Sequence, residues 1–173
     1  DPWKYLESQW NGYGSISLGI PVLERSWSLD KTELQPFFEL NDTDVNVASD
    51  SIDFDFLVAD YGDIYIDMAY EIVNDLTESG LNSRMVILNP EQYAEQVWKN
   101  RQFQAFFGPL PVTYGPNNYL FSTLHSGGKW NIIGHSDVKL DQLIERQNGI
   151  AEPYDRGLLF KEIQLHLLDK AYI

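Results

Sequence analysis

The clearest hydrophobic pattern of the chain begins at residue 52. Ile52, Phe54 and Phe56 alternate with two aspartates, and three apolar residues follow up to position 59. Alternation with a period of two indicates a strand with one face buried, and the apolar run indicates that its end is buried on both faces. After a turn at residues 60–63, apolar residues recur with the period of a helix, at Ile64, Met68, Ile72 and Leu76.

The same succession of strand and helix continues along the chain. Parallel strands need a long crossover between them, and a helix usually supplies it. The order strand, helix, strand, helix, strand therefore predicts an α/β fold with a mainly parallel sheet flanked by helices. The pattern predicts strands over residues 52–59, 84–88 and 103–108, and helices over residues 64–79, 90–100, 137–148 and 154–169.

The first 45 residues lack a sustained period. Glycine or proline recurs at positions 12, 14, 19, 21 and 36, so short strands such as residues 15–20 fit this segment better than a helix does. Three of the five tryptophans lie here, and we interpret them as side chains that cover a core. The sequence therefore predicts an irregular, strand-containing leading segment over residues 1–45, packed on an α/β domain over residues 46–173.

Charge and composition narrow the possible partners. The chain carries 26 acidic and 12 basic residues, a formal net charge of −14. Repulsion of that size disfavours polyanions, so we expect no nucleic acid and no anionic membrane surface as a partner. The absence of cysteine excludes disulfides, thiolate metal ligands and a cysteine nucleophile.

Residues 104–137 combine a strand with a long loop that contains several prolines and glycines. Ligands of α/β proteins commonly lie where strands run into such loops. The loop supplies aromatic and amide side chains that can stack on and hydrogen-bond to a small polar molecule, among them Tyr114, Asn118, Trp130 and Asn131. Binding of a small solute is therefore the leading interpretation.

Known catalytic motifs are missing from the chain. It has no GxSxG elbow, no phosphate-binding glycine loop and no HExxH zinc motif. Glu162 and His166 stand one helical turn apart, and we interpret them as an exposed pair and not as a metal site. We expect no catalytic residue, metal or cofactor. Two alternatives to binding stay open: a hydrolase that uses carboxylates near Asp60 and Asp63, although turn and cap roles also explain these, and a stand-alone interaction module.

Four segments, in one continuous order, resemble a single protein family. They are LVADYGDIYIDMAYEIVNDL, ILNPEQYAEQVWKNRQFQAFFG, LHSGGKWNIIGHSDVKLDQLIE and PYDRGLLFKEIQLHLLDKAYI. Together they are similar to the carboxy-terminal lobe of the family 5 extracellular solute-binding proteins, the peptide, nickel and oligosaccharide receptors of ABC importers. The segment GYGSISLGIPVLERSW resembles more weakly the part of that family that leads into this lobe.

The resemblance implies a periplasmic-binding-protein-like lobe of type II, one half of a two-lobed clamp that closes on its ligand. It implies a solute-binding component of an ABC transporter and not an enzyme. The implied partners are a small peptide, sugar or related solute, the amino-terminal lobe of a longer parent, and the membrane permease. The parent would be periplasmic or extracellular and associated with the membrane. The expected ligand-binding residues are Phe107, Pro109, Val112, Tyr114, Asn118, Trp130 and Asn131.

Two positions differ from the peptide receptors of that family. Those receptors carry a tryptophan after the glycine of the third strand and, three residues further, an aspartate that holds the α-amine of the ligand. Here Pro109 follows Gly108, and Val112 stands at the aspartate position. A free ammonium group would meet no counter-charge there. The difference favours a neutral ligand such as a sugar, or a peptide that is held in another way.

Overall fold

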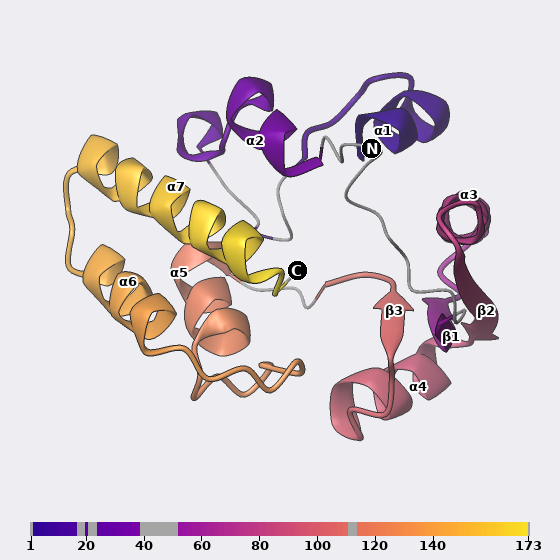
Figure 1. Cartoon of the computed structure of the whole chain (residues 1–173). Helices are drawn as coiled ribbons and strands as arrows, with labels where there is room; N and C mark the ends of the chain where they lie inside the picture. Colours follow the sequence, from indigo (N-terminus) through magenta and orange to yellow (C-terminus); the bar gives the residue numbers. More distant parts are fainter. Residues whose placement is uncertain (1, 17–19, 21–23, 39–51, 111–113, 173) are drawn as a thin grey trace. The chain divides into compact units, whose positions relative to one another are not determined.

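The computed structural model describes residues 2–16, 20, 24–38, 52–110 and 114–172 (Figure 1). The chain forms two compact units. The first unit comprises residues 1–15 and 39–110, and the second comprises residues 16–38 and 111–173. The domain boundary predicted at residues 45–46 lies outside the described residues and stays a prediction. Within the described ranges, no helix is both long enough and apolar enough to cross a membrane.

A parallel sheet of three described strands forms the centre of the first unit. The strands are β1 (Ile52–Ala59), β2 (Leu81–Leu88) and β3 (Ala105–Phe107), in the order β2-β1-β3. Ile52 pairs with Leu81 and Ala59 with Leu88, so β1 and β2 run in register over their whole length. The α/β fold with a parallel sheet flanked by helices is therefore confirmed, and β2 begins three residues earlier than the sequence pattern predicts.

The predicted crossover helices connect these strands. They are α3 (Asp63–Glu78) and α4 (Pro90–Tyr93), and α4 continues as a π-helical turn, η2 (Ala94–Lys99). The core under α3 consists of Phe56, Val58 and Ala69, with partly buried apolar residues around them. Asn89 and Gln92 form a capping box that starts α4, because each side chain accepts a hydrogen bond from the backbone N–H of the other residue.

The first unit also contains a helix that the pattern analysis missed, α1 (Pro2–Trp10). Its contacts with α3 are polar. Lys4 forms an ion pair with Asp75, and the Tyr5 hydroxyl donates a hydrogen bond of 2.7 Å to the same carboxylate. Ser8 and Gln9 donate hydrogen bonds of 2.9 and 2.7 Å to Glu71. Because α1 buries no residue fully, side-chain hydrogen bonds contribute much of its attachment.

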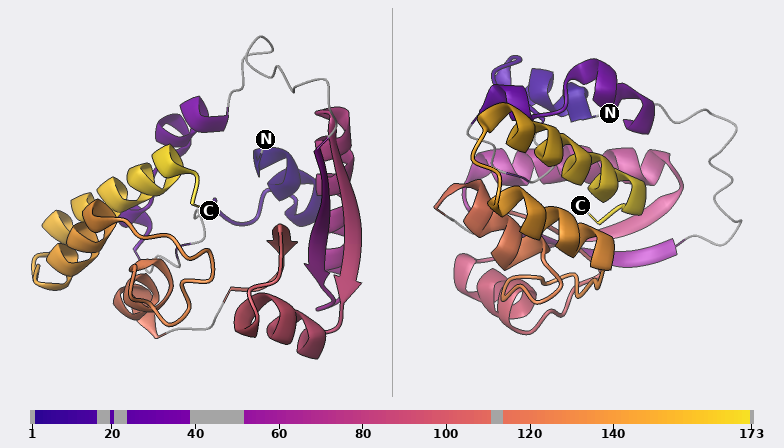
Figure 2. Two further views of the ribbon diagram at one scale, coloured as in Figure 1. Left: turned by 60° about the horizontal axis from the view of Figure 1, so that its bottom comes forward. Right: turned by 90° about the vertical axis from the view of Figure 1, so that its left-hand side faces the viewer.

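The second unit is helical in its described part. Figure 2 shows two of its helices, α6 (Val138–Asn148) and α7 (Pro153–Lys170), lying side by side. The other helical elements are η1 (Arg25–Trp27), α2 (Lys31–Phe38), α5 (Gly115–Tyr119) and the π-helical turn η3 (Leu120–Leu124). Their shared core consists of Ile20, Tyr119, Leu120, Leu124, Leu140, Leu143, Ile144, Leu159, Phe160, Ile163 and Leu167.

Gln164 on α7 holds the segment from η1 to α2 in place. Its side-chain amide donates a 2.7 Å hydrogen bond to the carbonyl of Trp27 and accepts one of 3.2 Å from the N–H of Leu29. The Gln164 side chain is buried, so both backbone groups obtain partners away from water. A capping box between Asp30 and Glu33 then starts α2, with hydrogen bonds of 2.9 Å in each direction.

The leading segment contains helices that the pattern did not predict, and most of the strand expected over residues 15–20 lies outside the described residues and stays a prediction. Residues 2–10 and 31–38 are helices, and Ser15 and Ile16 lie in no strand. Gly12 and Gly14 follow α1, where their positive φ angles of 78° and 141° serve a turn. Pro36 lies inside α2, which continues through it. The glycines after α1 and the proline within α2 therefore did not exclude short helices.

Replacing Gly157 tests the contact between η1 and α7. A Cβ at this position would lie 2.6 Å from Cδ1 of Trp27, much closer than atoms pack. Alanine is favoured over glycine in a helix by about 1 kcal/mol, but overpacking costs about 1–3 kcal/mol. We expect Gly157→Ala to lower the free energy of unfolding by about 1 kcal/mol in urea denaturation, with a change in tryptophan fluorescence.

The matched control is Gly149→Ala, since the nearest atom to a Cβ there lies at 3.7 Å. This variant should unfold within about 0.5 kcal/mol of the wild type. If Gly157→Ala proves as stable as the wild type or more stable, Trp27 does not pack against α7 as described.

Candidate functional site

The carboxyl ends of the three strands meet at one edge of the sheet in the first unit. Because the strands are parallel, the residues that follow Ala59, Leu88 and Phe107 all emerge there. The N–H of Asp60 donates a 2.8 Å hydrogen bond to the carbonyl of Leu88, which extends the pairing of β1 by one step. Open α/β sheets bind ligands at this kind of edge, which is therefore the candidate site of the first unit.

Aromatic side chains cover part of this edge. The ring of Phe107 lies 5.9 Å from that of Tyr65, and Tyr65 lies 6.0 Å from Tyr61, both at tilted angles. Phe107 and Tyr65 are half-buried, and Tyr61 is exposed. The three rings form a ladder from the sheet core to the surface. Such a ladder can stack on a flat or ring-shaped solute without contributing charge.

Gly108 permits a close approach at the same edge. A Cβ on this residue would lie 2.6 Å from the hydroxyl of Tyr93 and 2.8 Å from Cβ of Ala59. The Tyr93 hydroxyl is buried and has no hydrogen-bond partner within the described part of the chain. Burial, together with the nearby Tyr61 and Tyr65, raises the pKa of Tyr93 and keeps the hydroxyl neutral. Pro109 follows, half-buried and uncharged.

Asp60 and Asp63 have structural roles in the turn after β1. Asp60 is exposed, and its Oδ1 accepts a long hydrogen bond of 3.4 Å from the N–H of Gly62. Asp63 is the first residue of α3 and not its cap, because Gly62 occupies the cap position with a φ of 107°. An acidic residue in a first turn stabilises the helix dipole. No cluster of three or more histidine, aspartate or glutamate residues able to hold a metal occurs in the described ranges.

In the second unit, the stretch expected to be a loop is partly helical. Residues 115–124 form α5 and η3, and Pro116 stands in the first turn, where its missing N–H costs nothing. Tyr114 precedes this helix and is 93% exposed, and Asn118 on α5 is also exposed. Both side chains are therefore available for contact. Val112 lies outside the described residues, and its role stays a prediction.

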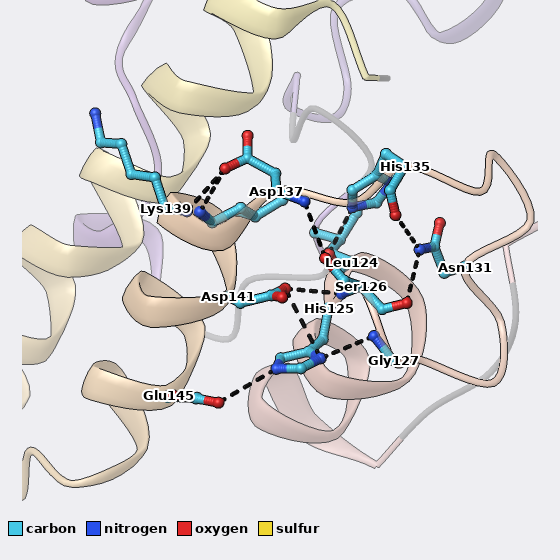
Figure 3. Close-up of polar contacts among 11 residues, drawn as sticks. Leu124, His125, Ser126, Gly127, Asn131, His135, Asp137, Lys139, Asp141 and Glu145 are labelled. Carbon is cyan, nitrogen blue, oxygen red and sulfur yellow. Dashed lines mark hydrogen bonds and ion pairs between the residues drawn. The ribbon is translucent and has the colours of Figure 1, made fainter.

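Asn131 holds together the loop before α6, as Figure 3 shows. Its amide nitrogen donates hydrogen bonds to the carbonyls of Ser126 at 3.3 Å and His135 at 2.8 Å. Its amide oxygen accepts one of 3.1 Å from the N–H of Gly134. The residue is only 4% exposed. The amide that the sequence suggested for a ligand is thus engaged with loop backbone at both its nitrogen and its oxygen.

The neighbouring Trp130 is half-buried in the same loop. The backbone N–H of Trp130 donates a 2.7 Å hydrogen bond to the carbonyl of Ser122, which ties the loop to η3. Lys129 places its ammonium group 5.3 Å from the centre of the indole ring, within the range of a cation–π contact. The ring is therefore held near the surface.

His125 and Ser126 join this loop to α6 (Figure 3). The N–H of Ser126 donates a 2.7 Å hydrogen bond to Asp141, and Nδ1 of His125 lies 3.7 Å from the same carboxylate. Nε2 of His125 lies 3.4 Å from Glu145. These contacts join the start of the loop to α6.

The end of the loop depends on a partly buried carboxylate, Asp137, whose role the sequence interpretation missed. One oxygen of Asp137 accepts hydrogen bonds from the N–H groups of Lys139 and Leu140 and caps α6. The other accepts them from Nε2 of His166 at 2.7 Å and from the Tyr172 hydroxyl at 3.1 Å. His166 is buried, so its interpretation as an exposed partner of Glu162 is wrong. The position of Asp137 at the start of the helix predicted over residues 137–148 was the available signal.

Burial and hydrogen bonding shift the pKa of Asp137 in opposite directions. Burial alone would raise the pKa of this carboxyl, but the hydrogen bonds from His166, Leu140 and Tyr172 outweigh it and lower the pKa to about 2. The group is therefore ionised at neutral pH. The carboxylate of Asp137 thus joins the start of α6 to His166 on α7 and to Tyr172 through hydrogen bonds.

Several solved structures have a fold similar to that of this chain. AppA, the oligopeptide-binding protein from Bacillus subtilis, matches 99% of this chain and 38% of its own length, at 18% identity and a TM-score of 0.73. A periplasmic oligopeptide-binding protein from Thermotoga maritima has the same coverages, at 12% identity and a TM-score of 0.70. A nickel ABC transporter protein from Bacillus halodurans matches with 16% identity and a TM-score of 0.63.

These neighbours have the fold that the four sequence segments predicted, so the fold of a periplasmic-binding-protein-like lobe is confirmed. The chain spans about 38% of the length of AppA. No family model matches the sequence, and no curated protein is significantly similar to it.

The charge of Asp137 should be visible in the pH dependence of stability. Its folded pKa of about 2 lies below the ordinary value of 3.8, so its contribution is complete above pH 5 and is lost as the pH falls toward 2. We expect Asp137→Asn to lower the free energy of unfolding by roughly 1–3 kcal/mol at pH 7. The difference from the wild type should shrink between pH 4 and pH 2, as measured by urea denaturation at each pH.

Asp67→Asn is the control, because Asp67 is an exposed carboxylate on α3. It should leave both the stability at pH 7 and its acid dependence close to those of the wild type. A difference between Asp137→Asn and wild type that stays constant from pH 7 to pH 2 would contradict the assigned role of the charge.

Proposed function

We propose that this chain is one lobe of the solute-binding component of an ABC importer. The observation that carries the proposal is the match of nearly the whole chain to ABC transporter binding proteins, with TM-scores of up to 0.73. The aromatic ladder at the carboxyl edge of the sheet supports it, since this edge is where such folds bind ligands. Turn and first-turn roles account for Asp60 and Asp63.

The ligand we propose is a small solute without a dominant charge. Phe107 and Pro109 are our ligand-binding residues in the first unit, and both are uncharged. Val112 is retained from the sequence, where the resembled peptide receptors carry an aspartate. The structural neighbours allow either class of ligand, because AppA was solved with a nonapeptide and the Thermotoga protein with mannohexaose. The uncharged residues that follow β3 favour the face of a sugar or an uncharged peptide segment as their contact.

In the second unit we propose Tyr114, Asn118 and Trp130 as ligand-binding residues. Exposure of the first two and the surface position of the indole support this assignment. Asn131 takes a different role in the proposal. Its amide is occupied by backbone groups, so it positions the loop that carries Trp130.

The proposal also covers partners and location. We propose that the rest of a longer parent supplies a second lobe and that an ABC membrane permease receives the solute. The parent would act in the periplasm or outside the cell, in association with the membrane. The net charge of −14 agrees with the absence of nucleic acid from the proposed partners.

The parent protein allows a direct test by isothermal titration. We expect an uncharged oligosaccharide or an amino-terminally acetylated peptide to bind more tightly than the same peptide with a free amine. Phe107→Ala and Trp130→Ala should each weaken that binding about tenfold or more, because each removes a stacking surface. Tyr70→Ala removes an exposed ring on α3 and serves as the control, with unchanged affinity expected.

Two outcomes would contradict the proposal. A free-amine peptide that binds more tightly than its acetylated form would overturn the neutral ligand. Turnover of an ester, peptide or glycoside by the purified chain, abolished by Asp60→Asn or Asp63→Asn, would replace binding with hydrolysis.

The chain by itself should bind only weakly. If a two-lobed parent binds with a Kd of about 1 μM, or −8 kcal/mol, and each lobe supplies half of the contacts, one lobe retains about −4 kcal/mol. That corresponds to a Kd in the millimolar range, which NMR titration of the 173-residue chain can measure. Micromolar binding by the monomeric chain, abolished by Trp130→Ala, would show that a single lobe holds the complete site.

A further inference from the structure

A separate cavity lies within the second unit, beside the first turns of α7 and η1. Its volume is about 520 Å³, large enough for a small organic molecule. The side chains that matter for its chemistry are Trp27, Tyr154, Leu158, Glu24, Glu152 and Lys161. None of them is among the residues proposed above for solute binding.

Trp27 forms a firmly held part of the cavity wall. Its ring stacks on Phe160 at 4.9 Å and packs against Gly157 on α7. The guanidinium carbon of Arg156 lies 5.5 Å from the ring centre, and Gln164 binds the Trp27 carbonyl. The indole is therefore held from several sides before any ligand arrives, which reduces the entropy cost of binding.

The remaining apolar wall comes from α7. Tyr154 is 72% exposed and Leu158 is 51% exposed, and both line the cavity. They stand four residues apart, so they project from the same side of the helix. Water-exposed apolar surface of this kind, next to a fixed indole, favours a ligand with an aromatic or aliphatic body.

The charge of the cavity is negative. Lys161 is the one cation among the six side chains, and its ammonium group pairs with Glu33 at 2.8 Å. Glu24 and Glu152 are exposed carboxylates, and no cationic side chain of the described residues lies within ion-pair distance of either. The positive end of the α7 dipole lies nearby, but Glu152 and Asp155 offset it at the cap and in the first turn.

We propose that this cavity binds a small organic cation with an apolar or aromatic body. The cationic group would lie toward Glu24 and Glu152, and the body against Trp27, Tyr154 and Leu158. Aromatic rings beside carboxylates attract ammonium groups through both Coulomb and cation–π terms. A neutral sugar could donate hydrogen bonds to the two carboxylates but would not neutralise their charge, as an ammonium group would. The inference does not depend on the importer function, because it uses other residues and another ligand.

Titration of the 173-residue chain with three matched probes tests the charge requirement. Benzylammonium carries the proposed cation, benzyl alcohol is its neutral analogue, and benzoate is its anionic analogue. We expect benzylammonium to bind in the millimolar range and at least about fivefold more tightly than benzyl alcohol, which is near 1 kcal/mol. Amide NMR shifts should be confined to residues 24–27 and 152–161, together with the Trp27 indole N–H.

Three results would overturn the proposal. The first is equal or tighter binding of benzyl alcohol or benzoate, and the second is a set of NMR shifts that lies elsewhere. The third is displacement of benzylammonium by a neutral hexose at lower concentration, which would assign the cavity to sugars. Failure of the importer proposal would change none of these measurements.

Variants assign the binding to the cavity. The double variant Glu24→Gln with Glu152→Gln should reduce benzylammonium affinity to that of benzyl alcohol, because it removes both charges and keeps the shape. Glu145→Gln and Glu162→Gln change exposed glutamates on α6 and α7 outside the cavity and should leave the affinity unchanged. Tyr154→Ala should weaken benzylammonium and benzyl alcohol alike. Unchanged benzylammonium binding by the double variant would refute the role of the carboxylates.

Discussion

The pairing of β1 with a parallel strand on each side is the constraint on which the first unit depends. It forces crossover helices between the strands, and it brings all three carboxyl ends to one edge of the sheet. Close packing at that edge then limits the residues that can follow β3. Gly108 lies against the Tyr93 hydroxyl and Ala59, so a larger residue would push β3 away from β1. The aromatic ladder that ends at Tyr61 can form because Phe107 lies on that edge.

In the second unit, buried and partly buried polar side chains join segments that are distant in sequence. Gln164 binds the backbone on both sides of Ser28, and Asp137 joins the start of α6 to His166 and Tyr172. Gln147 is fully buried, accepts two hydrogen bonds from Arg156 and donates one to Asn117. Such groups add specificity because any other arrangement would leave them without partners in a low-dielectric core. They hold the loops of this unit in place.

The fold indicates where a ligand would bind, and the side chains at that place indicate which ligand. Proteins of the same fold have been solved with a nonapeptide and with mannohexaose. Function must therefore be argued from the residues at the site. The segment of that edge formed by Phe107, Gly108 and Pro109 carries no charge. The cavity beside Trp27 is lined by two carboxylates without a cationic partner in the described part of the chain. Two surfaces of one chain thus suit solutes of different charge.

Hydrophobic periodicity by itself determined β1, α3, α6 and α7, because each has a regular apolar pattern long enough to outweigh local exceptions. The same reasoning missed α1 and α2, where the helices are short and glycine or proline lies close by. It also treated Asn131 as a free amide and His166 as an exposed side chain. Only the tertiary structure shows the environments of these two side chains. Asn131 binds loop backbone, and His166 binds Asp137, which is 29 residues away in sequence. A sequence pattern shows which face of an element is apolar, but the partner of a buried polar group is chosen by packing between distant segments.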